Sequence, residues 1–302
     1  MLTFIIIPIY NESKVIYKLL QNEEFRKYSL ILVDDGSKDP LSLNEISIPF
    51  YFVQHSENLG QGAALQTGME MAKLLQADIA VHFDGDGQHD PTDIDALTEP
   101  VRLGKAHVVI GSRFLKHKGG NNPSKIPFSR KIILQCARFV QFLFTGMILT
   151  DSQNGLRALS AAALQSIQVT ENRMAHAIEL IQIFKTRRFA VLEAPVNITY
   201  TEYSNLKGQK VLNGFFIVLR LLVNKLVKNI SFSALLITLP AGIFIWLFKP
   251  GLEVLPLSGI FIFMYLFNIC WLLIVRNTKK RFIAATSAIR HESLQNAKRY
   301  NY

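Results

Sequence analysis

The segment Asp84–Gln88 has the residue types of a site for a hard divalent cation. It directly follows an apolar, β-branched run, Ile79–Phe83, which predicts a buried strand. Asp84 and Asp86 point the same way if the backbone stays extended, and Gln88 adds a neutral oxygen. Such oxygens can hold Mg²⁺ or Mn²⁺ and leave positions for water and substrate phosphates. The alternative is an ordinary turn, because Asp and Gly also favour turns.

Two other predicted strand ends carry residues suited to a nucleotide. Asp34 and Asp35 follow a strand expected at Leu30–Val33, and neighbouring carboxylates can accept hydrogen bonds from a base or a ribose. The first strand, expected at Leu2–Ile9, runs into the segment Pro8–Glu12, which offers an aromatic ring and a carboxylate. A turn or helix cap is the alternative for the acidic pair, and a simple strand end is the alternative for the first segment.

Three further segments could meet phosphates. A small-residue loop at 58–64, which includes Gly62, opens a helix and would let the backbone approach a diphosphate. It lacks the Gly-Lys-Ser/Thr of a P-loop. Arg113 follows another strand, and Asp151 and Arg157 stand six residues apart in a predicted loop. Tight packing is the alternative for the glycine loop, and surface ion pairs are the alternative for the charged residues. The histidines without metal-ligand spacing, interpreted as surface or core residues, are His82, His89, His107 and His117.

Short apolar runs alternate with helical patterns through the first 200 residues. Strands are expected at Leu2–Ile9, Leu30–Val33, Tyr51–Gln54, Ile79–Phe83, Val108–Ile110 and Phe189–Asn197. Helices are expected at Ser13–Asn22, Ala63–Gln76, Thr92–Leu103, Lys125–Leu149 and Ala175–Lys185. This alternation predicts an α/β fold, with a mostly parallel, Rossmann-like sheet flanked by helices. Ligands of such sheets bind outside the carboxyl ends of the strands, where the polar residues above are expected to lie.

The C-terminal third predicts a membrane anchor. The chain of 302 residues has a net charge of +10, yet residues 229–248 and 254–275 carry no charge. An α-helix rises ~1.5 Å per residue, so each run could cross a hydrocarbon core of ~30 Å. Basic residues crowd both outer flanks, which places the catalytic domain in the cytoplasm. Residues 207–228 mix basic and apolar side chains, as a helix on a membrane surface does. The alternatives are a buried hairpin and an ordinary domain helix.

The predicted organisation follows from these segments. A catalytic domain is expected at 1–206, an interfacial helix at 207–228, transmembrane helices at 229–248 and 254–275, and a basic cytoplasmic tail at 276–302. Two cysteines favour neither a disulfide framework nor a zinc site. The apolar N-terminus is expected to be a buried strand rather than an export signal. The expected location is a bacterial inner membrane, and nucleic acid is not an expected partner because the basic residues gather at the membrane flanks.

In this order and spacing, the motifs resemble the family-2 inverting glycosyltransferases of the GT-A fold. The resemblance is closest to the dolichol-phosphate mannose synthase-like and polyprenyl-phosphate branch, covers about Leu2 to Asn197, and includes Glu179 and Glu193. It implies a nucleotide site formed by Pro8, Tyr10, Glu12, Asp34, Asp35, Gly62, Asp84 and Gly85. It implies the catalytic residues Asp86, Asp84, Arg113, Asp151 and Arg157, and the metal ligands Asp84, Asp86 and Gln88. Leu156 stands where the family often has Phe, and the Gln-x-x-Arg-Trp motif of processive synthases is absent from the sequence.

The sequence therefore predicts a metal-dependent, membrane-anchored enzyme that moves one sugar from a UDP- or GDP-linked donor to a polyprenyl or dolichyl phosphate. Mg²⁺ or Mn²⁺ would neutralise the charge that builds on the leaving diphosphate. A phosphate acceptor needs little or no general base, whereas a hydroxyl acceptor would need a carboxylate such as Asp151. The alternatives are a diacylglycerol or lipid-linked saccharide acceptor, and a non-catalytic membrane scaffold. The sugar, the base, the lipid and the presence of a homo-oligomer stay open.

Overall fold

The computed structural model describes residues 1–116, 128–171, 175–199, 277, 280–281 and 283–300. The chain divides into two compact units, one formed by Met1–Phe215 with Thr286–Tyr302 and the other by Phe216–Ala285. Among the described residues, no helix is long and apolar enough to cross a membrane. The predicted interfacial helix at 207–228 and the predicted spans at 229–248 and 254–275 lie outside the described residues.

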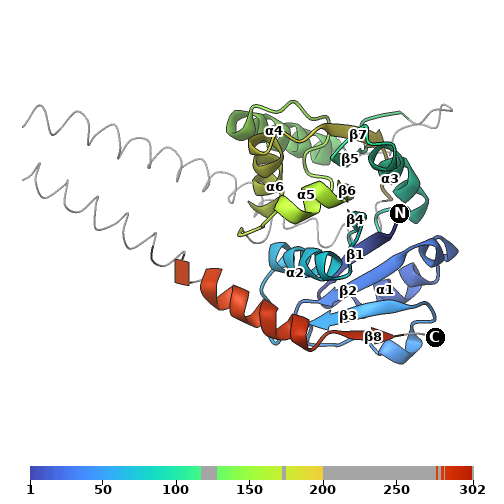
Figure 1. Cartoon of the computed structure of the whole chain (residues 1–302). Coiled ribbons are helices and arrows are strands. Elements are labelled where there is room, and N and C mark those ends of the chain that lie inside the picture. Colours follow the sequence, from blue (N-terminus) through green and yellow to red (C-terminus); the bar gives the residue numbers. More distant parts are fainter. Residues whose placement is uncertain (117–127, 172–174, 200–276, 278–279, 282, 301–302) are drawn as a thin grey trace, which may run out of the picture. The chain divides into compact units, whose positions relative to one another are not determined.

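An eight-stranded mixed sheet organises the first unit, in the order β7-β5-β6-β4-β1-β2-β3-β8 (Figure 1). The strands are β1 (Thr3–Ile9), β2 (Ser29–Asp34), β3 (Phe50–Gln54), β4 (Ile79–His82), β5 (Val108–Ser112), β6 (Arg157–Ser160), β7 (Val191–Pro195) and β8 (Lys298–Tyr300). Strands β4, β1, β2 and β3 are mutually parallel, and β7 is parallel to β5. Strand β6 runs antiparallel to both β4 and β5, and β8 runs antiparallel to β3. The carboxyl ends of β1 to β5 therefore all lie at one edge of the sheet.

Helices cover both faces of this sheet (Figure 1). The α-helices are α1 (Ser13–Leu20), α2 (Gln61–Leu74), α3 (Ile94–Arg102), α4 (Phe128–Thr145), α5 (Ala161–Ser166) and α6 (Ala175–Thr186). The 3₁₀ helices are η1 (Glu23–Lys27), η2 (Leu43–Glu45) and η3 (Pro91–Asp93). Apolar side chains of α1 and α3 share one core cluster with the sheet, and those of α2, α5 and α6 share a second. A further helical segment, at 283–295, precedes β8.

Strand β1 explains why the sheet must be covered on both sides. All seven of its residues are buried, and successive side chains alternate between the two core clusters. Ile5, Ile7 and Ile9 face the α1 and α3 side, while Phe4 and Ile6 face the α2 side. An unbroken apolar run is the pattern expected of a central parallel strand. The prediction of an α/β sheet flanked by helices is therefore confirmed.

Two parts of the predicted fold differ from the structure. Arg157 was predicted to lie in a loop, but it is the first residue of β6, and this strand runs antiparallel to both of its neighbours and makes the sheet mixed. Residues 276–302 were predicted as a basic tail, but the part from Thr286 belongs to the first unit and ends in β8. Most other predicted elements agree with the observed ones to within about two residues at each end. Asp90 caps η3 by accepting a hydrogen bond from the backbone N–H of Thr92.

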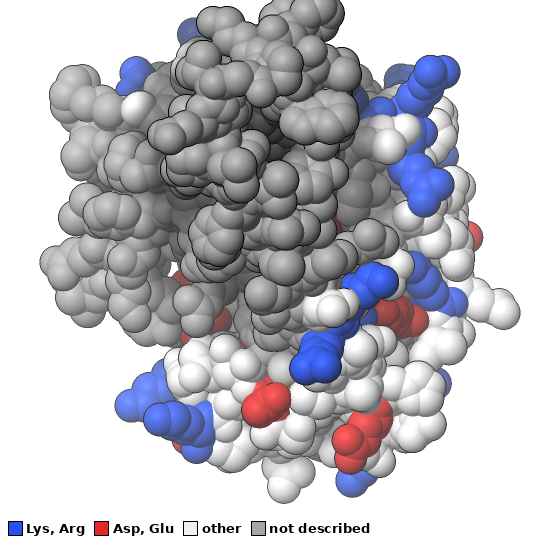
Figure 2. Space-filling model, turned by 90° about the vertical axis from the view of Figure 1, so that its left-hand side faces the viewer, with Lys and Arg blue, Asp and Glu red and all other residues white. Residues whose placement is uncertain are grey.

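Charge on the described surface is mixed rather than concentrated. On the face drawn in Figure 2, Lys and Arg side chains occupy several separate places, with Asp and Glu side chains among them. Over the described part of that face there is no continuous basic stripe of the kind that nucleic-acid-binding proteins present.

Candidate active site

The predicted site residues lie close together because β1, β2, β4 and β5, which most of them follow, run in the same direction. Pro8 pairs with Val33 and Ile9 pairs with Asp34 across β1 and β2, and the backbone N–H of Asp35 donates to the carbonyl oxygen of Ile9 at 2.9 Å. Strand β4 lies on the other side of β1, so the Asp84–Gln88 loop emerges beside the same strand ends. This is the edge where ligands of parallel α/β sheets bind.

Gly85 packs the acidic loop against the end of β1. A Cβ at Gly85 would lie 2.9 Å from the side chain of Ile16, 3.0 Å from the carbonyl oxygen of Pro8 and 3.3 Å from Oε2 of Glu12. A larger residue at this position would have to displace these neighbours. Glu12 is buried, whereas Tyr10 is 40% exposed and its ring is accessible to a ligand. The first motif and the Asp84–Gln88 loop thus form one continuous surface.

The two carboxylates of the acidic loop have different surroundings. Asp86 accepts hydrogen bonds from the backbone N–H of Gln88 at 3.1 Å and from its Nε2 at 2.6 Å. Asp84 accepts from Gln61 Nε2 at 2.8 Å, and its Oδ2 lies 3.4 Å from His89 Nε2. Burial acts to raise the pKa of Asp84, but the hydrogen bond and charge of His89, with the charge of Arg157, outweigh it and lower that pKa. Asp84 is therefore ionised at neutral pH.

His89 is a site residue that the sequence interpretation missed. It is buried against Asp84, and the only available signal was its place directly after Gln88. The interpretation of His82 as a core residue is confirmed, because it is buried in β4. Burial lowers its pKa to about 3, so its ring is neutral at pH 7. In the part of the chain that the structure describes, neither ring nitrogen of His82 has a hydrogen-bond partner.

The loop that precedes β6 lies directly on Asp84. A Cβ built on Gly155 would come within 1.9 Å of Asp84 Oδ2, which is far inside van der Waals contact. Asn154 shapes this loop, because its Oδ1 accepts from the backbone N–H of Leu156 at 2.9 Å and its side chain is fully buried. Two motifs that are about 70 residues apart in the sequence therefore form one site.

The adjacent acids Asp34 and Asp35 have different hydrogen-bond partners. Asp34 accepts from the backbone N–H of Ser37 at 2.9 Å and from Gln54 Nε2 at 3.0 Å. Asp35 binds the loop ahead of α2, through four neighbours whose side-chain or backbone donors lie 2.7–3.0 Å from its carboxylate: His55, Asn58, Leu59 and Gly60. Both acids are buried. Asp35 thus fixes the loop that leads to Gly62, which is buried in the first turn of α2.

Arg113 and Asp151 form a buried ion pair rather than a surface pair. Arg113 Nε lies 2.5 Å from Asp151 Oδ2, and the two side chains are 8% and 1% exposed. The backbone N–H of Arg113 donates to the same oxygen at 3.1 Å. A carboxylate oxygen that accepts from both a guanidinium and a backbone amide of one residue fixes the position of that residue. Asp151 therefore orients Arg113, and it is poorly placed to accept a proton from a substrate.

Arg157 is a buried cation at the start of β6. Its side chain is 1% exposed, and burial lowers the pKa of its guanidinium to about 10, against the opposing charges of Asp84 and Asp151. It stays protonated at neutral pH. Its Nε has no hydrogen-bond partner among the residues that the structure describes. Arg157 thus supplies positive charge close to two carboxylates at the strand ends.

Glu193 in β7 holds the Asp151 loop and was not in the predicted site. Its carboxylate accepts from the backbone N–H of Thr150 at 2.8 and 2.9 Å, from the Thr150 hydroxyl at 2.7 Å and from the backbone N–H of Asp151 at 3.0 Å. Glu179 acts similarly on another loop, accepting from the backbone N–H groups of Thr170 and Glu171. Both glutamates are positioning residues, which a sequence pattern alone cannot distinguish from ligand-binding ones.

Replacing Glu193 with alanine should lower the free energy of unfolding by about 2 kcal/mol, because hydrogen bonds to a carboxylate are lost and backbone donors lose their acceptor. Urea titration followed by circular dichroism measures this as a lower midpoint at constant slope. Glu45→Ala is the control, since Glu45 is exposed in η2. Equal midpoints for the two variants would mean that Glu193 does not hold the loop.

The residues at Asp84–Gln88 fit a hard divalent cation. Two carboxylates and one amide oxygen lie within five residues, and Asp84 is ionised. Such a set suits Mg²⁺ or Mn²⁺, which keeps other positions for water and phosphate oxygens. Across the described ranges, no group of three or more His, Cys, Asp or Glu side chains could hold a metal ion. Three oxygen donors leave part of the coordination shell of such an ion to water and substrate oxygens.

Comparison with known proteins defines the class. The model of glycosyl transferase family 2 matches residues 4–167. A UDP-N-acetylglucosamine–dolichyl-phosphate N-acetylglucosaminyltransferase of Methanococcus voltae is 36% identical over 75% of this chain and 97% of that protein. A dolichol-phosphate mannosyltransferase of Pyrococcus furiosus is 27% identical over 81% of this chain and 71% of that protein. This protein is a glycosyltransferase. The chain belongs to glycosyl transferase family 2.

A solved structure shares the fold of this chain. A crystal structure of glucosyl-3-phosphoglycerate synthase from Mycobacterium tuberculosis, in complex with Mn²⁺, uridine diphosphate and phosphoglyceric acid, matches with a TM-score of 0.50. It is 17% identical and covers 72% of this chain and 78% of that one. The likeness concerns the fold, a mixed sheet of GT-A type flanked by helices.

Proposed function

We propose that the protein transfers one sugar, with inversion, from a nucleotide sugar to a polyprenyl or dolichyl phosphate. The observation that carries the proposal is the 36% identity to a dolichyl-phosphate N-acetylglucosaminyltransferase over 97% of that relative's length. A second named relative acts on dolichol phosphate with a different sugar, so the acceptor is the common feature. The donor is a UDP- or GDP-linked sugar.

The donor binds along the carboxyl ends of β1, β2 and β4. Tyr10 contacts the base and ribose, Asp34 holds the loop at Ser37 beside them, and the loop at Asp84–Gln88 lies under the diphosphate. Asp84, Asp86 and Gln88 would hold Mg²⁺ or Mn²⁺, which neutralises the charge that develops on the leaving diphosphate. Pro8, Glu12 and Gly85 shape this surface by close packing. Asp35 and Gly62 act on the donor indirectly, by fixing the loop ahead of α2.

The acceptor side of the site supports a phosphate. Arg113 and Arg157 are buried cations, and a guanidinium suits a phosphate because its donors match two oxygens. A hydroxyl acceptor would need a base, but Asp151, the predicted candidate, is bound by Arg113. A phosphate is already an anion at pH 7 and can attack without losing a proton. Attack from the face opposite the diphosphate inverts the anomeric carbon.

The membrane arrangement is part of the proposal. Residues 229–248 and 254–275 form two spans, 207–228 lie on the membrane surface, and the catalytic domain faces the cytoplasm. Two uncharged runs of 20 and 22 residues with basic flanks support this, because each is long enough to cross a bilayer. The arrangement holds the site next to the lipid that carries the acceptor phosphate.

A donor and acceptor panel tests the proposal. Full-length protein in detergent with Mn²⁺ or Mg²⁺ is given UDP-N-acetylglucosamine, UDP-glucose or GDP-mannose, each with a polyprenyl phosphate. We expect one donor to yield a glycosylated lipid phosphate. Diacylglycerol and the dephosphorylated polyprenol are the matched controls, and they should yield at least about 30-fold less product, because removing a charged partner typically costs about 2–5 kcal/mol. Transfer to diacylglycerol but not to the lipid phosphate would reject the acceptor.

A further inference from the structure

The C-terminal segment Thr286–Tyr300 covers the outer edge of the catalytic sheet. Strand β8 pairs with β3 in antiparallel register, with Tyr300 opposite Phe50 and Lys298 opposite Phe52 (Figure 1). Without β8, strand β3 would be an edge strand with unpaired backbone groups, which is a weak point of a sheet. The chain leaves this unit after Phe215 and rejoins it at Thr286.

Side chains reinforce the pairing on both parts of the segment. The rings of Tyr300 and Phe50 stack with centroids 5.0 Å apart and planes 10° apart, and the Arg299 guanidinium lies 5.5 Å from the Tyr51 ring centroid. In the preceding helix, Leu294 packs against the core on the α2 side. These contacts bury a specific face of the segment, so it is more than a charged extension.

Arg290 adds a polar contact to α2. Its side chain is buried, and its Nη2 lies 3.8 Å from Oε1 of Glu70. Glu70 also accepts a hydrogen bond from Gln66 Nε2 at 2.9 Å. Gln66 in turn accepts from the backbone N–H of Val169 at 2.7 Å, which joins α2 to the segment after α5. The C-terminal helix is thus linked to the helix that follows the glycine loop.

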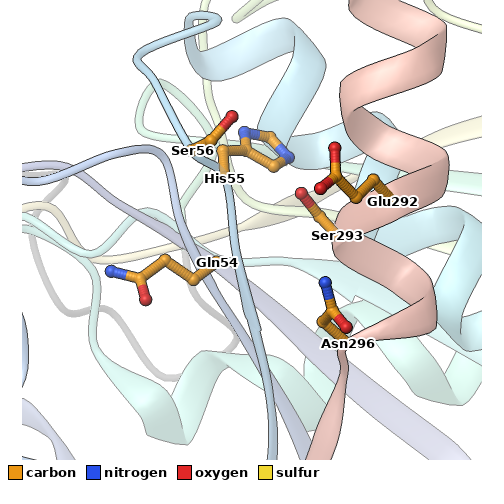
Figure 3. Close-up of a pocket in the computed structure, with 6 residues that line it drawn as sticks. All are labelled: Gln54, His55, Ser56, Glu292, Ser293 and Asn296. Atoms are coloured by element: carbon orange, nitrogen blue, oxygen red, sulfur yellow. The ribbon is translucent and has the colours of Figure 1, made fainter.

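Strand β3 ends at Gln54, and this residue and the following His55 hold the acidic pair. Gln54 donates to Asp34 Oδ2 at 3.0 Å, and His55 Nδ1 lies 2.7 Å from Asp35 Oδ1. A polar cavity of about 300 Å³ lies next to this strand end. Figure 3 shows His55 on one side of it and residues of the C-terminal helix on the other. The residues that line this cavity are Gln54, His55, Ser56, Glu292, Ser293 and Asn296. The C-terminal segment therefore packs beside the strand end from which Asp34 and Asp35 are held.

We propose that Thr286–Tyr300 is a positioning element of the donor site. By pairing with β3, it fixes Gln54 and His55, and through them it fixes the carboxylates of Asp34 and Asp35. Tyr300 and Arg290 are its positioning residues. The inference rests on the proposed role of Asp34 in nucleotide binding, and it predicts that the segment affects donor affinity and leaves acceptor recognition unchanged.

The test compares full-length protein with a deletion of residues 297–302, with Tyr300→Ala and with the control Lys298→Ala, whose side chain is exposed in the same strand. Calorimetry with UDP and with GDP, each with Mn²⁺, measures the Kd. Hydrogen exchange measures the protection of the Ser37, Leu59 and Gly60 amides, which donate to Asp34 and Asp35. We expect about a tenfold weaker Kd for the deletion, about threefold for Tyr300→Ala and no change for Lys298→Ala. We also expect faster exchange at those amides.

A double-mutant cycle separates positioning from general stability. If β8 acts through Gln54, then Tyr300→Ala combined with Gln54→Ala should weaken the Kd by less than the product of the single effects. Additive effects, or unchanged exchange at Ser37, Leu59 and Gly60, would overturn the proposal. If the unaltered protein bound neither nucleotide, the donor assignment would fail, while the exchange measurement would still decide whether β8 orders these loops. No acceptor is present, so failure of the lipid-phosphate assignment cannot affect the outcome.

Discussion

Replacing Asp86 with alanine is expected to reduce sugar transfer by at least about 1,000-fold in kcat, because the variant loses a carboxylate that would hold the divalent ion under the leaving diphosphate. The loss should appear mainly in kcat, since charge builds on the diphosphate in the transition state more than in the bound donor. Asp86 is only partly buried, so the fold should persist. Initial rates with saturating donor and lipid phosphate measure the effect.

Removal of the metal gives the matching result in the unaltered protein. Chelation with EDTA should stop transfer, and added Mn²⁺ should restore it, whereas Mn²⁺ should not restore the Asp86→Ala variant. Electron paramagnetic resonance of Mn²⁺ in the presence of UDP provides a readout other than turnover: the bound fraction should fall in the variant. Glu99→Ala, an exposed acid on α3, is the control for loss of negative charge alone. Normal turnover by Asp86→Ala would reject the proposal that Asp86 holds the metal ion.

The pattern of apolar residues in the sequence was sufficient to predict the parallel strands of the sheet. Central strands such as β1 are buried on both faces, so they read as unbroken apolar runs that local periodicity can identify. Strand β6 gave no such signal, because it has four residues and starts with a buried arginine. Strand β8 is likewise short, with the sequence Lys-Arg-Tyr. Both strands form because they pair with segments that are distant in the sequence. The local pattern of apolar residues does not show such pairing.

The position of the candidate site residues in the fold was predictable, but their contacts were not. The rule that ligands bind at strand carboxyl ends gathers Asp34, Asp84 and Arg113 correctly at one edge. The sequence could not show that Asp151 is bound by Arg113, because the two residues are 38 positions apart and meet only in the folded chain. The same holds for Asp35, whose partners lie 20–25 positions away. What each of these side chains does depends on the residues that it contacts, and those contacts are set by the order of the strands in the sheet.

Replacing Gly155 with alanine should lower kcat by about 100-fold with little loss of stability. The added methyl would overlap Asp84 Oδ2 at 1.9 Å, so the carboxylate must move by more than about 1 Å. Displacements of that size in a catalytic site typically cost about 100-fold in rate. The Asp84 side chain is 25% exposed and can swing aside, so the core is not disturbed and Tm should stay within a few degrees of the unaltered value.

The comparison variant for Gly155→Ala is Gly104→Ala. Gly104 has a positive φ of 67°, and a Cβ there meets nothing within 4 Å, so this change strains a backbone without touching the site. We expect Gly104→Ala to lower Tm and to leave kcat unchanged, the reverse of Gly155→Ala. Affinity for UDP with Mn²⁺ should also fall in Gly155→Ala, because Asp84 is one of the proposed ligands of the ion. If Gly155→Ala kept full kcat and full nucleotide affinity, the carboxylate of Asp84 would not need its observed position, and the placement of the metal on Asp84 would have to be abandoned.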